Sequence, residues 1–314
     1  MAWKILVTAP YLQPAIDRFR QIFDENGIKL VLPKVDERLE EDELLGLVGD
    51  IHGVICGDDR FTKKVLESAP QLKVISKWGT GIDSIDQTVC RQLGVTICNT
   101  PNAFSEPVAD SILGYIICFA RKLPWMDYNI KQGVWDKIPG KALRECTLGV
   151  IGVGNVGKAV VRRATAFGMK IIGNDIESMP AAFLEKTGIE MISKDELLEQ
   201  ADFVSLNCDL NPTSYHLMSQ EEFARMKNSS VVINTARGPI IDESALTEAL
   251  QKQHIAGAAL DVFETEPLPA DSPLRNMDNV LMAPHNANSS PEAWENVHSN
   301  TINNLIHHLS KGQT

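Results

Sequence analysis

The sequence predicts an α/β protein built from two doubly wound parallel-sheet domains. Apolar strand patterns alternate with helical patterns along the chain, and 314 residues are enough for two separate cores. The glycine-rich turn GVIGVGNVG stands at residues 149–157, almost halfway along the chain. Nucleotide-binding folds usually begin with such a turn, so we expect a different domain in front of it.

The first half reads as a complete α/β unit without a phosphate-binding turn. Strand patterns alternate with helical ones, which indicates a parallel sheet covered on both faces. The strand patterns are 4–9, 28–32, 53–57, 72–76 and 95–99. The helical patterns are 15–26, 39–49, 62–69 and 89–94.

The second half repeats this organisation after a long apolar helical stretch. Residues 105–132 form that stretch, which we expect to break near Pro124. Strand patterns then follow at 146–152, 171–175, 203–208, 231–236, 256–263 and 280–284. The segment from Pro291 is again helical and could fold back onto the first half. We therefore expect one domain inserted within another, with a cleft between them.

The glycine-rich turn has the features of a dinucleotide site. It runs from a strand into Gly152-x-Gly154-x-x-Gly157, then into a helix whose amino terminus favours phosphate. A second strand ends at Asp175, 18 positions after Gly157, where a carboxylate would bind the ribose hydroxyls. Ile176 and Glu177 follow, so no cation stands ready for a 2′-phosphate. NAD is the expected cofactor.

Composition excludes several classes of partner. A formal net charge of -11 argues against nucleic acid and anionic membrane surfaces. The opening MAWKILVTAP has too short an apolar run for a signal peptide or a membrane span. The six cysteines show no CxxC pair and several of them end apolar stretches, so we expect buried, reduced thiols and a cytoplasmic protein. No metal site is predicted.

Three residues after strand patterns could perform chemistry beside a nicotinamide. His285 follows the strand at 280–284, and an imidazole can exchange a proton near neutral pH. Glu266 follows the preceding strand and would fix the tautomer of His285. Arg237 ends another strand, and its planar guanidinium could hold a carboxylate. Each alone could equally be a cap or a surface ion pair; their joint placement favours a catalytic site.

The chain resembles the D-isomer-specific 2-hydroxyacid dehydrogenase family over nearly its whole length. The resemblance rests on KWGTGIDSID, CNTPNAFSEPVAD, LGVIGVGNVG, SLNCDLNP, INTARGPIIDESAL, GAALDVFETEP and APHNA, in the family's order. It implies a flavodoxin-like substrate domain, residues 1–101 and 288–314, with an inserted Rossmann NAD domain, residues 102–287. It also implies a homodimer built around the helix near residues 105–130.

The resemblance implies roles for individual residues. Arg237 would bind the substrate's carboxylate and carbonyl, His285 would be the catalytic acid and base, and Glu266 its partner. The substrate site would comprise Lys77, Trp78, Gly79, Thr80, Arg237 and His285. The cofactor site would comprise Gly152, Gly154, Asn155, Val156, Gly157, Asp175, Ile176, Cys208, Thr213, Thr235, Ala236, Arg237, Asp261 and His285.

The implied reaction is reversible hydride transfer between NAD and C2 of a 2-hydroxy acid. Among family members the chain is most similar to phosphoglycerate dehydrogenases, which favours 3-phosphoglycerate, without the regulatory domain that some carry. Lys77 stands where an arginine is common, Arg60 comes a few positions late, and Asp209 replaces a frequent proline. Lys137 of a neighbouring subunit could also reach the site.

Other interpretations stay open. Glyoxylate, hydroxypyruvate or pyruvate could be the substrate instead of a phosphorylated acid. A formate- or phosphite-oxidising relative would share the fold, but a formate enzyme carries glutamine where this chain has Glu266. A non-enzymatic NAD-binding scaffold of the corepressor type would keep similar residues. Turnover with 2-keto acids separates the enzyme from the scaffold.

Overall fold

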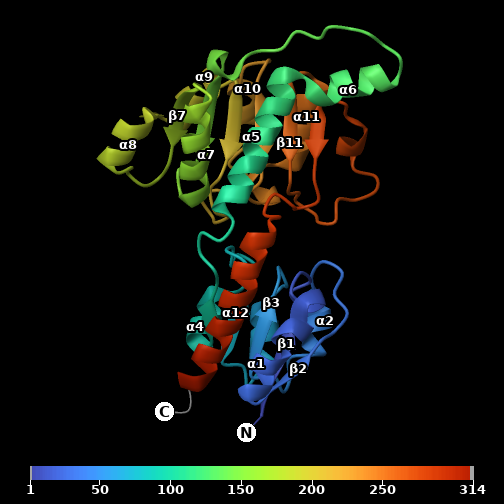
Figure 1. The fold of residues 1–314 in the computed structure, drawn as a ribbon, viewed down its shortest axis with the longest axis vertical. Helices are drawn as coiled ribbons and strands as arrows, with labels where there is room; N and C mark the ends of the chain where they lie inside the picture. The colour runs from blue at the N-terminus through green and yellow to red at the C-terminus, as the bar shows by residue number, and fades with distance from the viewer. Residues whose placement is uncertain (1, 312–314) are drawn as a thin grey trace. The chain divides into compact units, whose positions relative to one another are not determined.

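The protein folds into two compact α/β units in a computed structural model that describes residues 2–311. One unit comprises Met1–Phe104 with Ser290–Thr314, and the other comprises Ser105–Ser289. Each unit has its own parallel sheet with helices on both faces (Figure 1). The predicted fold class is confirmed.

The sheet of the first unit has the flavodoxin-like strand order β2-β1-β3-β4-β5. All of its described pairings are parallel. β3 and β4 are buried throughout because helices cover both faces, as parallel sheets require. The strands are β1 (Trp3–Val7), β2 (Ile28–Val31), β3 (Gly53–Cys56), β4 (Val74–Lys77) and β5 (Thr96–Cys98).

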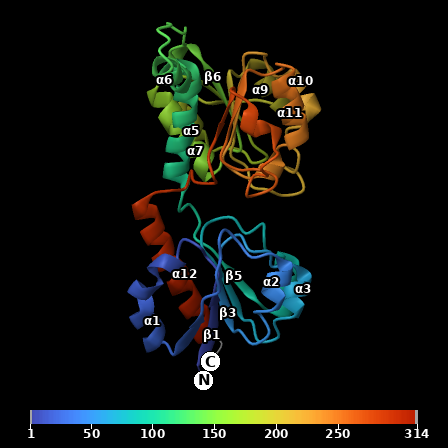
Figure 2. The same cartoon turned by 90° about the vertical axis from the view of Figure 1, so that its right-hand side faces the viewer.

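The helices of the first unit come from both ends of the chain. Figure 2 shows α1 and α12 on one face of the sheet and α2 and α3 on the other. α12 packs against β3, β4 and β5, and the Ser76 hydroxyl donates to the Thr301 carbonyl at 2.8 Å. The elements are η1 (Gln13–Phe19, a 3-10 helix), α1 (Arg20–Glu25), α2 (Glu41–Leu45), α3 (Lys63–Glu67), α4 (Gln87–Leu93) and α12 (Pro291–Lys311).

The sheet of the second unit has the strand order of dinucleotide-binding folds, β12-β11-β10-β9-β6-β7-β8. The order reverses beside β6, which leads into the glycine-rich turn. The two-residue strand β8 was not predicted, because so short an edge strand leaves no alternation pattern. The strands are β6 (Thr147–Ile151), β7 (Lys170–Asn174), β8 (Glu190–Met191), β9 (Phe203–Leu206), β10 (Val231–Asn234), β11 (Gly257–Leu260) and β12 (Val280–Met282).

Helices also cover both faces of the second sheet. In Figure 2, α5 and α7 lie on one face and α10 and α11 on the other. The helices are α5 (Ser105–Arg121), α6 (Leu123–Lys131), α7 (Asn155–Ala166), α8 (Ala181–Thr187), α9 (Lys194–Gln200), α10 (Gln220–Arg225) and α11 (Glu243–Gln251). The 3-10 helices are η2 (Leu143–Glu145), η3 (Gly238–Ile240) and η4 (Pro273–Asn276).

Several expected elements differ in detail. The helix expected at 15–26 begins as η1, with Pro14 in its first turn, and becomes α1 at Arg20. The long apolar helix breaks at Lys122, which has a left-handed φ of 57°, so that Pro124 falls in the first turn of α6. Proline is compatible with a first turn because no donor is needed there.

The division between the units lies a few residues from the expected boundaries. Residues 102–104 belong to the first unit, since the Phe104 ring packs 5.6 Å from that of Trp78. Residues 288–289 belong to the second unit, where the Ser289 N–H donates to the Asn286 carbonyl. The change of unit therefore follows local packing rather than the ends of the sequence motifs.

Two further expectations concern the burial of the cysteines and the presence of membrane-spanning helices. Three of the six free cysteines are buried, whereas Cys98, Cys118 and Cys208 are only half-buried. The expectation of uniformly buried thiols is therefore wrong for these three. Within residues 2–311, every helix is too short or too polar to cross a membrane.

Candidate active site

The glycine-rich turn connects β6 to α7. Gly152 has φ 85°, and a Cβ there would lie 2.6 Å from the Cys208 nitrogen, so only glycine fits. A Cβ at Gly157 would lie 2.1 Å from the Gly152 carbonyl oxygen. At Gly154, by contrast, a Cβ would meet nothing within 4 Å. The turn therefore packs tightly against the sheet and is open at Gly154.

The open side of the turn leads to the amino terminus of α7. In the described chain no side chain caps this 12-residue helix, whose first residue, Asn155, is exposed. Its first N–H groups have no partner within the helix and carry the positive end of the helix dipole. Together with Gly154, they form a cradle that fits a pyrophosphate. Val156 is half-buried in the same turn.

Asp175 closes the cradle from the end of β7. Its two carboxylate oxygens accept the N–H groups of Val153 at 2.6 Å and Glu177 at 2.8 Å. The side chain thus fixes the glycine-rich turn to the neighbouring strand, while Ile176 is 87% exposed. The residues expected to hold the adenosine half of NAD are thus contiguous.

The loop after β9 carries the remaining cofactor residues expected there. Burial raises the pKa of the Cys208 thiol to about 11, which makes it a poor nucleophile at neutral pH. Thr213 donates from its N–H and its hydroxyl to the Asn211 side chain, at 2.8 and 2.7 Å. Asn211, which sequence reasoning missed, therefore sets the shape of this loop.

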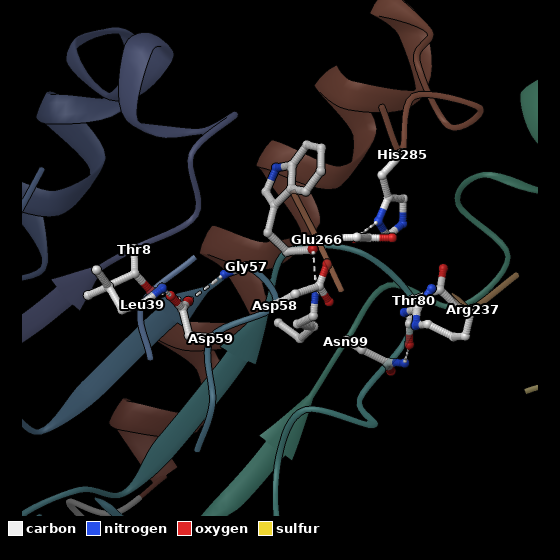
Figure 3. Close-up of polar contacts among 12 residues, drawn as sticks. Thr8, Leu39, Gly57, Asp58, Asp59, Thr80, Asn99, Arg237, Glu266 and His285 are labelled. Carbon is white, nitrogen blue, oxygen red and sulfur yellow. Dashed lines mark hydrogen bonds and ion pairs between the residues drawn. The ribbon is translucent and has the colours of Figure 1, made fainter. Parts of the chain in front are cut away.

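His285 and Glu266 form a close pair at the carboxyl end of the second sheet. His285 Nδ1 lies 3.0 Å from Glu266 Oε2 (Figure 3). The other oxygen, Oε1, accepts the Phe263 N–H at 2.9 Å. The two side chains are 21% and 18% exposed, so water screens the pair only in part. The carboxylate thereby fixes the orientation of the imidazole.

The backbone around His285 is held by Asp261, at the end of β11. His285 has a left-handed φ of 50°, and its N–H donates to the Asp261 carbonyl at 2.7 Å. The Asp261 carboxylate accepts the N–H groups of Asn286 and Ala287 at 2.8 and 2.9 Å. Burial raises the pKa of the Asp261 carboxyl, although these two hydrogen bonds favour its ionised form. Asp261 was expected at the nicotinamide, but the structure engages its carboxylate in bracing this loop.

Arg237 follows β10 in an extended conformation, and its neighbours set its position. Its Nη1 donates to the Ala236 carbonyl at 2.8 Å, and the Asn234 amide donates to the Arg237 carbonyl at 2.9 Å. The Asn234 oxygen accepts the Ala236 N–H, and Thr235 is buried. Sequence reasoning missed Asn234, although a buried amide at a strand end is a signal that could have found it.

Gly238 brings the arginine loop against the glutamate loop. A Cβ at Gly238 would lie 1.9 Å from both the carbonyl carbon and the carbonyl oxygen of Phe263. Only glycine allows this approach, and Phe263 is the residue whose N–H holds Glu266. The Gly-Pro sequence after Arg237 therefore has a structural cause, and it links Arg237 to the His285–Glu266 pair within one unit.

In the first unit, the expected substrate loop follows β4. The Gly79 carbonyl accepts the Thr100 N–H at 2.8 Å, and the Thr80 hydroxyl donates to the Thr100 carbonyl at 3.0 Å. The Asn99 amide donates to the Thr80 carbonyl at 2.5 Å. Within residues 2–311, the N–H groups of Gly79 and Thr80 have no hydrogen-bond partner. A fixed loop with two such donors can bind a carboxylate.

Trp78 contributes only its backbone to this loop. Its side chain is 4% exposed, and its Nε1 donates to His298 Nδ1 of α12 at 2.9 Å. Burial lowers the pKa of His298, which keeps that imidazole neutral and able to accept. The indole thus anchors the loop to α12.

Lys77 borders the loop, and two consecutive acids, Asp58 and Asp59, follow β3. Lys77 Nζ lies 3.2 Å from Asp58 Oδ1 and donates to the Trp78 carbonyl at 3.0 Å. Asp59 is fully buried. Sequence reasoning missed both acids; two consecutive carboxylates directly after a buried strand were the available signal. Among residues 2–311, no cluster of three or more metal-ligating side chains occurs.

Comparison with known proteins identifies a family match. Residues 113–287 match the family described as D-isomer specific 2-hydroxyacid dehydrogenase, NAD binding domain. A D-3-phosphoglycerate dehydrogenase of Methanocaldococcus jannaschii is 40% identical over 92% of this chain, which spans 54% of that protein. A glyoxylate reductase of Thermofilum pendens is 35% identical over 96% of this chain and 90% of its own length.

Solved structures agree with these matches. A crystal structure of D-lactate dehydrogenase from Aquifex aeolicus, complexed with NAD and lactic acid, superposes with a TM-score of 0.88. The two sequences are 25% identical, and the superposed region covers 98% of this chain and 96% of the dehydrogenase chain. The chain therefore spans about half the length of the phosphoglycerate dehydrogenase it matches, but nearly all of the shorter relatives.

Proposed function

The chain belongs to the D-isomer-specific 2-hydroxyacid dehydrogenase family, and we propose that it is an NAD-dependent oxidoreductase acting on the C2 hydroxyl of a D-2-hydroxy acid. The family match confirms NAD as the expected cofactor. The observation that carries the proposed reaction is the contact of His285 Nδ1 with Glu266 at 3.0 Å. It orients an imidazole for proton exchange at its other nitrogen, Nε2.

The cofactor and the residues divide the reaction between them. NAD, when bound, accepts the hydride from C2 or returns it. In reduction, protonated His285 donates its Nε2 proton to the substrate's carbonyl oxygen, and Glu266 stabilises the imidazolium. In oxidation, neutral His285 removes the hydroxyl proton. Arg237 binds the carboxylate and stabilises negative charge on the carbonyl oxygen.

We assign the cofactor to the second unit and the substrate loop to the first. Gly152, Gly154 and the start of α7 would hold the pyrophosphate, and Asp175 would face the ribose hydroxyls. The N–H groups of Gly79 and Thr80 would bind the substrate carboxylate. The substrate is either a phosphorylated acid, 3-phosphoglycerate, or a small unphosphorylated one. The charge beside Gly79 bears on the choice between them.

The test is NADH oxidation, followed by absorbance, with a panel of 2-keto acids. We expect turnover with at least one of hydroxypyruvate, 3-phosphohydroxypyruvate, glyoxylate and pyruvate. His285→Ala should lower kcat by about 1,000-fold, because proton transfer to the carbonyl is lost. The variant should bind NADH as the unmodified protein does, measured by fluorescence. Unchanged turnover would exclude His285 as the acid, and NADH binding without any turnover would favour a scaffold.

We also propose a homodimer formed through α5, α6 and the segment after α6. Large apolar side chains are exposed there, including Tyr128, Ile130 and Trp135, the last at 83%. Exposed apolar patches of this kind mark association surfaces in soluble proteins. Light scattering should give twice the chain mass of 34.6 kDa, and the double substitution Ile130→Asp with Trp135→Asp should give the monomer. A monomeric unmodified protein would contradict the assignment.

The compartment follows from the cysteines. All six are free, and burial raises the pKa of the Cys56 and Cys90 thiols, as expected of reduced cysteines in a core. Disulfides are rare where glutathione keeps thiols reduced. We propose that the protein works in the cytoplasm.

A further inference from the structure

An ion pair stands beside the loop that we propose binds the substrate carboxylate. A Cβ on Gly79 would lie 3.7 Å from Lys77 Nζ, so the ammonium group borders the loop. The same Nζ lies 3.2 Å from Asp58 Oδ1. The lysine side chain is 5% exposed and the aspartate 36%. The cation expected to attract a substrate phosphate is therefore already compensated by a carboxylate of this chain.

A second carboxylate holds Asp58 in place. The neighbouring Asp59 accepts hydrogen bonds from the Thr8 hydroxyl at 2.6 Å, the Leu39 N–H at 2.7 Å and the Gly57 N–H at 2.9 Å (Figure 3). Burial raises the pKa of Asp59, whereas these hydrogen bonds and the charge of Lys77 favour its ionised form. The segment after β3 is thus tied to two other segments, and this fixes the backbone that carries Asp58.

The other cation expected near the substrate shares its carboxylate with a second arginine. Arg60 Nε lies 3.9 Å from Glu40 Oε2, and the Arg38 Nε donates to Glu40 at 2.7 Å. The Arg60 side chain is 42% exposed, so solvent screens its charge. Lys77 is therefore the buried cation of the two, and its charge is balanced by Asp58.

The two charges next to the loop cancel. Lys77 contributes one positive charge, and Asp58 contributes one negative charge. A phosphate monoester carries about two negative charges near neutral pH, so Asp58 would repel it at close range. A 2-keto acid with a single carboxylate carries no second anionic group for Asp58 to repel.

We propose that Asp58 is a specificity-determining residue that makes this enzyme select 2-keto acids with a single negative charge and reject phosphorylated ones. The inference rests on the proposed function, since it concerns the substrate of that same site. It replaces the phosphorylated substrate favoured by the sequence with the class that includes hydroxypyruvate and glyoxylate. Lys77, held by Asp58, then serves to fix the Trp78 carbonyl and the shape of the loop.

The test compares two substrates that differ only in a phosphate, hydroxypyruvate and 3-phosphohydroxypyruvate. For each, kcat/KM is measured by NADH oxidation with the full chain and with Asp58→Asn, which keeps the shape of the side chain and removes its charge. The control is Asp50→Asn, which removes the carboxylate of the Lys4–Asp50 pair (2.6 Å) at the opposite, amino end of the same sheet. Circular dichroism melts show whether each variant is folded.

We expect the unmodified protein to prefer hydroxypyruvate. Asp58→Asn should raise the ratio of kcat/KM for the phosphorylated acid to that for hydroxypyruvate by about tenfold, and Asp50→Asn should leave the ratio unchanged. A preference of the unmodified protein for 3-phosphohydroxypyruvate would overturn the inference while leaving the proposed function intact. An equal change of the ratio in both variants would also overturn it. Absence of turnover with both acids, and also with glyoxylate and pyruvate, would instead contradict the proposed function itself.

Discussion

The two units each place a carboxylate against a basic side chain at the carboxyl end of a parallel sheet. In the second unit, Glu266 lies 3.0 Å from His285; in the first, Asp58 lies 3.2 Å from Lys77. The distances are nearly equal, but the bases differ. Imidazole gains and loses a proton near neutral pH, whereas a lysine presents a fixed charge. In our proposal, the same contact therefore supports proton transfer in the second unit and cancels a charge in the first.

The comparison shows that a short carboxylate–base distance does not define a function by itself. Both carboxylates are positioned by neighbouring backbone: the Phe263 N–H holds Glu266, and the bonds of Asp59 fix the segment that carries Asp58. The two pairs differ in the basic partner, which is an imidazole in one and an ammonium group in the other, and in the loop that each pair borders. Substitutions that change charge without changing shape can therefore separate the two roles.

The largest expected effect is a loss of kcat caused by a substitution in the second unit. Glu266→Gln should lower kcat by about 100- to 1,000-fold, because the amide neither stabilises the imidazolium nor fixes one tautomer of His285. NADH affinity should stay within about twofold, since the contact does not involve the glycine-rich turn. Stopped-flow NADH oxidation and fluorescence titration measure the two quantities.

A matched control lies two residues away on the same loop. Glu264 also contacts a histidine, His216, at 2.7 Å, but in a different pair. Glu264→Gln should retain kcat within about threefold, as expected for a partly exposed surface pair. Equal losses in both variants would mean that the loop as a whole, and not the His285 contact, limits the rate.

A smaller effect is expected at a third pair, which serves stability alone. Glu222 accepts from Lys194 Nζ at 2.7 Å and from the hydroxyl and N–H of Ser219, at the start of α10. Burial raises the pKa of Glu222, but these hydrogen bonds outweigh burial and hold it at about 2, below the ordinary value of 4.5. Glu222→Gln should reduce the free energy of unfolding at pH 7 by about 1–2 kcal/mol, after allowance for solvent screening.

The pH dependence gives the sign of that effect. Because the pKa is lower in the folded state, the stabilisation is complete above about pH 4.5 and is lost as the pH falls towards 2. Urea unfolding of the protein and of Glu222→Gln at pH 7, 4 and 3 should show two curves that converge on acidification. A difference that grows at low pH would contradict the assigned shift, and a changed kcat at pH 7 would contradict a purely structural role.

Most of the fold could be predicted because the strands are buried apolar runs between polar helices. The glycine-rich turn, Arg237, Glu266 and His285 could be proposed from the sequence because each follows a strand pattern or forms a known spacing. β8 and the 3-10 start of the first helix escaped because such short elements carry no periodicity. The role of Asp261 in bracing residues 286–287 depends on backbone contacts that sequence spacing does not encode.

The charge beside the substrate loop could not be predicted for a different reason. Lys77 and Asp58 lie 19 positions apart. Lys77 ends β4 and Asp58 follows β3, and the register of these neighbouring strands pairs Cys56 with Lys77. That register becomes known only from the sheet. The sequence shows a lysine where an anion could bind, and the structure shows the aspartate that compensates it.

The most direct measurement is the ratio of kcat/KM for hydroxypyruvate to that for 3-phosphohydroxypyruvate, in Glu266→Gln and Asp58→Asn side by side. We predict that Glu266→Gln lowers both constants and leaves the ratio unchanged, because both substrates need the same proton transfer. Asp58→Asn should shift the ratio towards the phosphorylated acid by about tenfold. We assign catalysis to the Glu266–His285 pair and substrate selection to the Asp58–Lys77 pair. A ratio that changes in Glu266→Gln, or that stays constant in Asp58→Asn, would contradict this assignment.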